Sequence, residues 1–117
     1  MIIAQYRNLF LCSAILAGCS QNLAPPPPCS LTKSSDILQD AFAKDTIVRT
    51  DGAKLMVNET AWLMLDNHQR LEILHARACI TGRGDLRKGW ATVADSKSGM
   101  LIAKGEWNGR EFILSDY

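Results

Sequence analysis

Four consecutive prolines, Pro25 to Pro28, are the feature that most limits how this chain can fold. Proline has no backbone N–H and a fixed φ, so the run excludes a helix or a central strand and favours extended polyproline II. We expect a spacer, residues 19–33, with the folded part only after it. The run therefore divides the chain into a short N-terminal part and one candidate domain, residues 34–117.

The N-terminal part has the order of a secretory signal. Its leader carries one charge, Arg7, and is followed by an apolar run from Leu9 to Ala17 and by the small residue Gly18. The run is too short to cross a bilayer core, which takes about 20 apolar residues. The pattern predicts export of the chain and removal of residues 1–18.

The end of this signal, Leu16-Ala17-Gly18-Cys19, resembles the lipobox of bacterial lipoproteins. In that family the cysteine thiol receives a diacylglyceryl group, and signal peptidase II cuts before the cysteine. The resemblance implies that Cys19 becomes the lipidated first residue of a mature chain anchored to the membrane through this lipid. It also implies an outer-membrane location facing the periplasm, because aspartate after the cysteine favours the inner membrane and this chain has Ser20.

Composition limits what the mature chain can do. Removing residues 1–18 from the 117 leaves 99, which is enough for one core and too few for two. Arg7 leaves with the signal, so 12 of the 13 basic side chains remain against 12 acidic ones, and the formal net charge is zero. This balance provides no basic excess that would favour nucleic acid or an anionic surface as a partner.

The four cysteines have different expected fates. Cys12 leaves with the signal and Cys19 carries lipid, which leaves Cys29 and Cys79 in an oxidising compartment. We expect a disulfide between them, which would stabilise the fold by about 4 kcal/mol for a loop of this length. The alternative is a cysteine kept free for another protein, because the sequence does not give the distance between the two.

Cap signals predict three helices, each beginning after a Ser, Asn or Asp whose side chain accepts a backbone hydrogen bond. They are expected over 36–44 after Ser34 or Ser35, over 59–64 after Asn58, and over 67–80 between Asp66 and Gly82. In the first helix, Phe42 should belong to the apolar face that packs on the core.

Turn signals predict five strands in a hairpin and a three-stranded meander. Asp51-Gly52 and Asn108-Gly109 are typical two-residue hairpin turns, because glycine and its neighbour tolerate positive φ. The strands are expected over 46–50, 53–57, 89–95, 100–107 and 110–114. The sequence therefore predicts an α+β fold in which a small antiparallel sheet packs with two or three short helices.

These turns decide which charged side chains face one another. They place Glu106 opposite Glu111 and Arg49 opposite Lys54. Like charges across a strand pair cost a few tenths of a kcal/mol, so we interpret these four residues as candidate recognition residues. Two facing carboxylates are also a candidate acid–base pair, but no nucleophile or oxyanion-hole loop accompanies them.

Two other patterns resemble known sites. His68, His75 and Cys79 share one face of the third expected helix, as a metal site would require. We predict no metal and no other cofactor there, because Cys79 has Cys29 as a partner and no fourth ligand is indicated. The tripeptide from Arg83 to Asp85 matches an integrin-adhesion motif, and we interpret it as a polar turn.

The folded part resembles small uncharacterised bacterial envelope proteins, through Trp62, Leu65 and a strand with Ile102-Ala103 that follows a Ser-Gly turn. This resemblance implies no particular activity. The sequence therefore favours a membrane-anchored binding or assembly module without catalysis. Its partners would be the membrane, through the lipid on Cys19, and another envelope protein. The alternatives are a spanin-like or secretion-pore or conjugation-pore accessory lipoprotein, and a small hydrolase or metal carrier.

The lipobox generates a direct prediction. A Cys19→Ser precursor should incorporate no labelled fatty acid and should stay uncleaved, because the thiol is the acceptor of the diacylglyceryl group. Radioactive fatty-acid labelling followed by electrophoresis measures both effects. Cys12→Ser is the matched control and should be labelled like the wild type. Labelling of the Cys19→Ser protein would refute the anchor.

Overall fold

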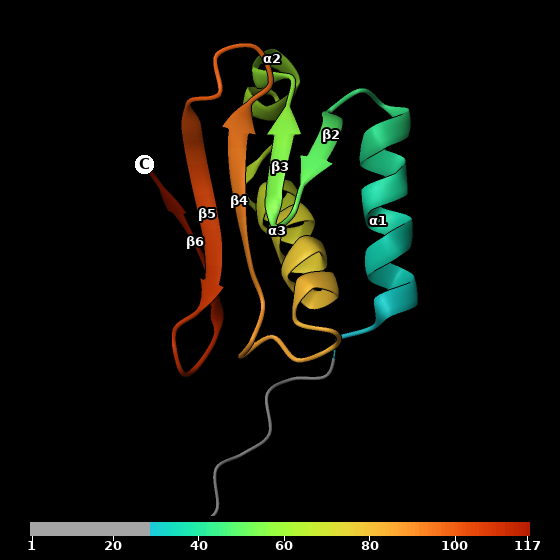
Figure 1. Ribbon diagram of the computed structural model, residues 1–117, viewed down its shortest axis with the longest axis vertical. Helices are drawn as coiled ribbons and strands as arrows, with labels where there is room; N and C mark the ends of the chain where they lie inside the picture. The colour runs from blue at the N-terminus through green and yellow to red at the C-terminus, as the bar shows by residue number, and fades with distance from the viewer. Residues whose placement is uncertain (1–28) are drawn as a thin grey trace, which may run out of the picture.

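The computed structural model describes residues 29–117, which form three helices and one five-stranded sheet (Figure 1). The predicted signal peptide, Cys19 and the proline run lie outside the described residues. The elements in chain order are α1 (Leu31–Ala43), β2 (Ile47–Asp51), β3 (Lys54–Val57), α2 (Glu59–Leu63), α3 (Asn67–Thr81), β4 (Trp90–Asp95), β5 (Leu101–Trp107) and β6 (Phe112–Asp116). The predicted α+β class, with a hairpin, a meander and short helices, is confirmed.

The sheet is mixed, whereas the sequence predicted an antiparallel one. Its strand order is β2-β3-β4-β5-β6, and every neighbouring pair is antiparallel except β3 and β4. These two strands run in parallel, with Leu55 opposite Val93. The reason is the connection: α2 and α3 carry the chain from the end of β3 back to the start of β4, as a parallel pair requires. The parallel pair joins the hairpin and the meander into one sheet.

The caps of α2 and α3 are those that the sequence predicts. The side chain of Asn58 accepts the N–H of Ala61 at 3.1 Å at the start of α2. At the start of α3, Asp66 accepts the N–H of Gln69 at 2.8 Å, and the Gln69 side chain accepts the N–H of Asp66 at 2.9 Å. Each cap satisfies donors that the first helical turn leaves free.

Helix α1 begins earlier than predicted. Its N-cap is Ser30, whose hydroxyl accepts the N–H of Lys33 at 3.1 Å, whereas the predicted cap Ser34 is a buried residue inside the helix. The folded part therefore includes residues 29–33, which were assigned to the spacer. The predicted burial of Phe42 is also wrong, because the buried stripe of α1 consists of Ser34, Leu38 and Ala41, and Phe42 lies beside this stripe and is 38% exposed.

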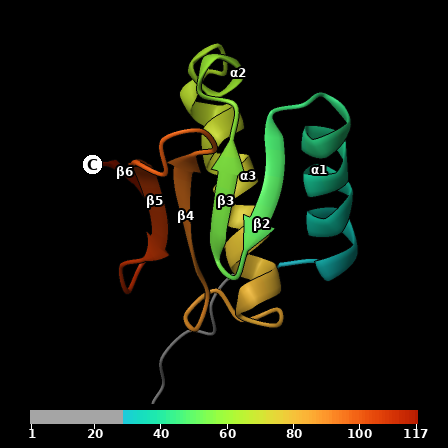
Figure 2. The ribbon, with the colours of Figure 1, turned by 45° about the horizontal axis from the view of Figure 1, so that its top comes forward.

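The core lies between the sheet and the helices α1 and α3, which both cover the same face (Figure 2). Alternate strand residues point to this face and are almost completely buried, including Leu55, Val57, Val93 and Ala103. They pack against Leu74 of α3. No helix among residues 29–117 covers the opposite face, which we call the open face of the sheet.

The first hairpin turn lies one residue later than predicted. Gly52 and Ala53 form the turn, and Asp51 pairs with Lys54. Only Gly52 has positive φ, at +60°, which fits a II′ turn with glycine in the first central position. The guanidinium of Arg77 in α3 donates to the Gly52 carbonyl oxygen from two nitrogens and so holds the turn against the helix.

The last hairpin has a four-residue turn, Asn108 to Glu111, in place of the predicted two residues. The side-chain oxygen of Asn108 accepts the N–H groups of both Arg110 and Glu111 at 2.9 Å, and its own N–H donates to the Glu111 carbonyl at 3.0 Å. Trp107 therefore pairs with Phe112, and every partner on β6 is shifted from the predicted register.

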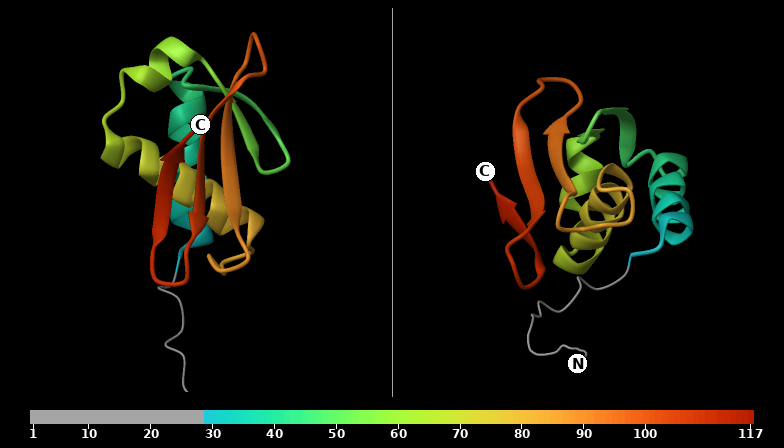
Figure 3. Two further views of the ribbon diagram at one scale, coloured as in Figure 1. Left: turned by 90° about the vertical axis from the view of Figure 1, so that its left-hand side faces the viewer. Right: turned by 60° about the horizontal axis from the view of Figure 1, so that its bottom comes forward.

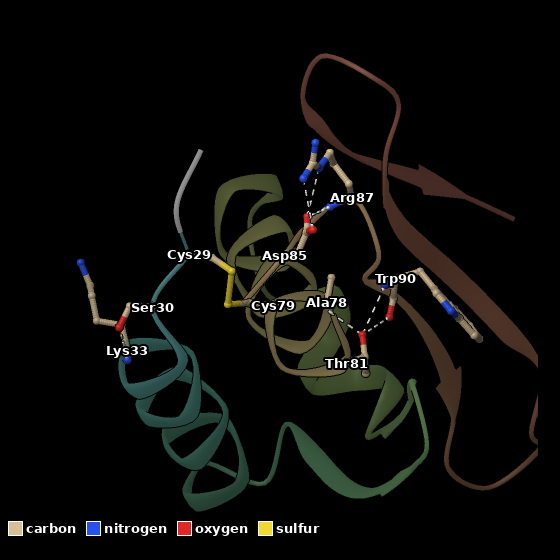
Figure 4. The surroundings of a disulfide bond; sticks show 9 residues. All are labelled: Cys29, Ser30, Lys33, Ala78, Cys79, Thr81, Asp85, Arg87 and Trp90. Atoms are coloured by element: carbon tan, nitrogen blue, oxygen red, sulfur yellow. Dashed lines mark hydrogen bonds and ion pairs between the residues drawn. A yellow bond between two sulfur atoms is a disulfide. The ribbon is translucent and has the colours of Figure 1, made fainter. Parts of the chain in front are cut away.

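The disulfide between Cys29 and Cys79 is present (Figure 4). The two Cα atoms are 6.0 Å apart, a separation that a disulfide spans without backbone movement. Cys79 is fully buried in the last turn of α3, and Cys29 stands just before α1. The bond joins the beginning of the domain to the end of its longest helix.

The bond should contribute strongly to stability. Replacing both cysteines, as Cys29→Ala with Cys79→Ala, should lower the free energy of unfolding by about 2–4 kcal/mol, because the unfolded chain regains the freedom of a 50-residue loop. Urea denaturation of the variant beside oxidised and reduced wild type measures this change. The reduced wild type should match the variant, and equal midpoints for all three samples would contradict the prediction.

Candidate functional site

The open face of the sheet is the main candidate site, because no other element of the described part covers it. Trp90 and Thr92 alternate along β4 with the buried Ala91 and Val93, so they point away from the helices. Cross-strand neighbours on this face form three rows: Trp90, Glu106 and Ile113; Asp51, Lys54, Thr92, Lys104 and Ser115; and Arg49, Met56, Ala94 and Leu101.

Trp90 is the most distinctive side chain on this face. Its backbone is fixed by Thr81 at the end of α3, whose hydroxyl donates to the Trp90 carbonyl at 3.0 Å and accepts from its N–H at 3.3 Å. The indole itself points away from the helix (Figure 4) and is 53% exposed. A rigidly held, exposed tryptophan is a typical anchor for a protein interface.

Exposed aliphatic side chains continue the apolar surface. Leu101 is 44% exposed in the row that also contains Met56, and Ile113 is half-buried beside Glu106. The sequence analysis did not single out these residues or Trp90. The exposure of Trp90 could have been predicted from the alternation of residues along the strand, because a strand that buries Ala91 and Val93 must turn Trp90 outward.

The predicted pair of Glu106 and Glu111 does not form. Glu106 faces Ile113, and Glu111 lies in the four-residue turn that Asn108 caps. Glu106 instead lies 3.6 Å from the ammonium of Lys104, in an ion pair whose two side chains are about half exposed. Such exposed pairs contribute little to stability. The acid–base arrangement considered from the sequence is therefore absent.

The predicted pair of Arg49 and Lys54 does not form either. Arg49 faces Met56, and one of its guanidinium nitrogens reaches the carbonyl of Ser96 at 3.5 Å. Lys54 faces Asp51, a residue of opposite charge. The like-charge reason for a recognition role is thus gone for all four candidates, although Arg49, Lys54 and Glu106 do lie on the open face.

His68 and His75 line a groove of about 430 Å³ between α1 and α3, beside Cys29. The ring of His75 meets Phe112 edge to face at 5.4 Å between centroids, and burial lowers the pKa of His75 below its usual 6.5. Cys79 is occupied by its disulfide. Among residues 29–117, no group of three His, Cys, Asp or Glu side chains is placed to hold a metal ion.

The loop from Arg83 to Asp85 follows α3. The carboxylate of Asp85 accepts the backbone N–H of Arg87 at 3.0 Å and two guanidinium hydrogen bonds, which hold the pKa of this carboxyl below its usual value. Asp85 is therefore engaged within its own loop, as expected of a polar turn.

Comparison of the chain with protein-family models, curated proteins and solved structures finds no match.

The position of His75 predicts a pH dependence of stability. Because its pKa is lower in the folded than in the unfolded state, the unfolded chain takes up a proton first as pH falls below about 6.5. The free energy of unfolding should therefore drop from about pH 7.5 to about pH 5.5, and less so in His75→Gln. Chemical denaturation at both pH values measures the difference, and His68→Gln, an exposed control, should follow the wild type. An unchanged pH dependence in His75→Gln would contradict the assignment.

Proposed function

We propose that this protein is a lipid-anchored module of the bacterial envelope that binds another envelope protein through the open face of its sheet. The observation that carries the proposal is the one-sided packing of the sheet, which leaves Trp90 and Leu101 exposed on the uncovered face. Catalysis is not part of the proposal.

The chemistry of the open face favours a protein as the partner. Interface cores are enriched in aromatic residues and arginine, and this face presents the exposed side chains of Trp90 and Arg49. Its charges are mixed, with Lys54 and Lys104 beside Asp51 and Glu106. A mixed surface around an apolar centre fits a partner with its own apolar patch and charges of both signs.

The lipobox supports the anchored location. Acylation of Cys19 would hold the protein at the outer membrane facing the periplasm, as the resemblance to lipoproteins implies. Among the described residues, no helix is long and apolar enough to cross a membrane. Anchoring would thus depend on lipid at Cys19, where several acyl chains bind a bilayer far more stably than one.

The disulfide bears on the alternative of a spanin-like or secretion-pore accessory lipoprotein. That alternative included a cysteine free to bridge to a partner. Both cysteines that follow Cys19 in the sequence, Cys29 and Cys79, are paired with each other. The observed bond therefore supports a module that binds its partner without a covalent link.

Site-specific photo-crosslinking tests the binding face. A benzophenone side chain at Trp90 or at Leu101 should give one discrete crosslinked product with an envelope protein in intact cells, because both positions lie on the open face. The matched control is Met64, which is apolar and 81% exposed but lies beyond α2, away from this face. Mass spectrometry of the product identifies the partner.

The controls separate the outcomes. Equal crosslinking at Met64 would indicate collision without recognition, and no product at Trp90 and Leu101 would refute a protein partner on this face. Binding of purified peptidoglycan, lost in Trp90→Ala, would also overturn the proposal, because the tryptophan would then serve a glycan.

A further inference from the structure

Charged side chains are distributed unevenly between the two ends of the domain. One end is formed by residues 29–33, the loop 82–89 and the turn 108–111, which lie together at the bottom of Figure 1 and are turned toward the viewer in the right panel of Figure 3. We call it the basic end, because it carries five cations against the two acidic residues Asp85 and Glu111. The cations are Lys33, Arg83, Arg87, Lys88 and Arg110, all exposed.

The three segments of the basic end are held together by recorded contacts. The disulfide joins Cys29 to α3, and the N–H of Gly84 donates to the Cys79 carbonyl at 2.8 Å. Trp90 at the start of β4 faces Glu106 near the end of β5, so the turn at 108–111 reaches the same end.

The opposite end has no such excess. It is formed by residues 44–46, 58–66 and 95–100, which carry the acidic residues Asp45, Glu59, Asp66 and Asp95 and the basic residues Lys44 and Lys97. The guanidinium groups of Arg49 and Arg70 also reach this end, where they donate to the carbonyls of Ser96 and of Trp62 and Leu63, so acidic and basic groups balance. The formal neutrality of the mature chain thus hides an excess of cations at the basic end.

The basic end is also the end at which the chain enters the domain. Only the nine residues from Ser20 to Pro28 separate Cys19 from Cys29. Nine residues span at most about 30 Å, even when fully extended. A lipid on Cys19 would therefore keep the basic end closer to the bilayer surface than the opposite end.

Arg83 occupies a backbone position that favours glycine. It has φ of +55° directly after the C-cap Gly82, its N–H donates to the Ile80 carbonyl at 3.0 Å, and the N–H of Gly84 bonds to Cys79. This is the Schellman arrangement, in which glycine usually takes the left-handed position. The left-handed backbone favours glycine over arginine at this position, whereas the helix dipole favours a cation there, and the side chain is exposed.

Lys33 occupies a position at which the helix disfavours a cation. It lies in the first turn of α1, where the helix dipole disfavours a cation and where this helix has no acidic residue. Of the five cations, Arg87 has an ion pair with Asp85 at 3.3 Å. The other four have no ion pair among the described residues. They are therefore available to an anionic surface.

We propose that the basic end binds the anionic phospholipid headgroups of the membrane that holds the lipid anchor. The inference rests on the proposed lipid anchor and adds an orientation to it: the basic end faces the bilayer, and the opposite end points away. Each Lys or Arg near an anionic bilayer strengthens binding about fivefold, within a Debye length of about 10 Å. A short tether makes such a weak contact effective, because it keeps the local concentration of headgroups high.

Vesicle binding of the mature chain, residues 19–117 made without acylation and with its disulfide formed, tests this contact independently of the anchor. Sedimentation with vesicles of phosphatidylcholine and phosphatidylglycerol should exceed that with phosphatidylcholine alone and should fall as salt is raised. In Arg83→Gly with Lys88→Gln, the partition constant should drop roughly 25-fold. The charge-matched control, Lys44→Gln with Lys97→Gln at the opposite end, should bind like the wild type.

Arg83→Gly also separates binding from folding. Because glycine suits the left-handed position, the melting temperature of Arg83→Gly should equal or exceed that of the wild type by a few degrees. A loss of binding in that protein cannot then be attributed to unfolding. Equal binding to both kinds of vesicle, or an equal loss in the control, would overturn the headgroup contact. If headgroup binding failed while Cys19 still incorporated labelled fatty acid, only the headgroup contact would be refuted, and the lipid anchor would stand.

Discussion

The disulfide between Cys29 and Cys79 is the constraint on which the rest of the arrangement depends. It ties the first described residue to the buried last turn of α3, and α1 then packs along α3 on one face of the sheet. Because the bond fixes where the chain enters the fold, it also fixes which end of the domain any N-terminal anchor must lie closest to.

Two different surfaces follow from this arrangement. The helices bury one face of the sheet, so the other face remains open, with Trp90 held by Thr81 and its indole exposed. The basic end lies at one edge of that surface, where α3 and β5 end and where β4 and β6 begin (Figure 3). A domain whose basic end rests on a bilayer would present its open face sideways, toward a partner at the same membrane.

Local signals in the sequence were sufficient to predict the structure wherever a few neighbouring residues determine it. Asn58 and the box of Asp66 and Gln69 are of this kind. The pairing of Cys29 with Cys79 was predictable for another reason, because only these two cysteines remain after Cys12 and Cys19 are assigned. The hairpin registers failed because turn signals left the turn length open: Asn108 caps a four-residue turn, and Arg77 from α3 holds the turn at Gly52. The parallel pair depends on the crossover through α2 and α3, and the uneven distribution of charge depends on which loops meet at one end. The local turn and cap signals do not reveal the parallel pair, and the overall charge balance does not reveal the uneven distribution of charge.

Depth measurement on the acylated protein tests the membrane-facing orientation most directly. A spin label can be placed at Lys88→Cys or at Lys97→Cys, since Cys29 and Cys79 are paired and Cys19 would carry lipid. In vesicles that contain phosphatidylglycerol, the label at position 88 should approach the headgroup layer, and the label at position 97 should remain in water. Equal depth for both labels, or a deeper label at position 97, would contradict a domain oriented by its basic end.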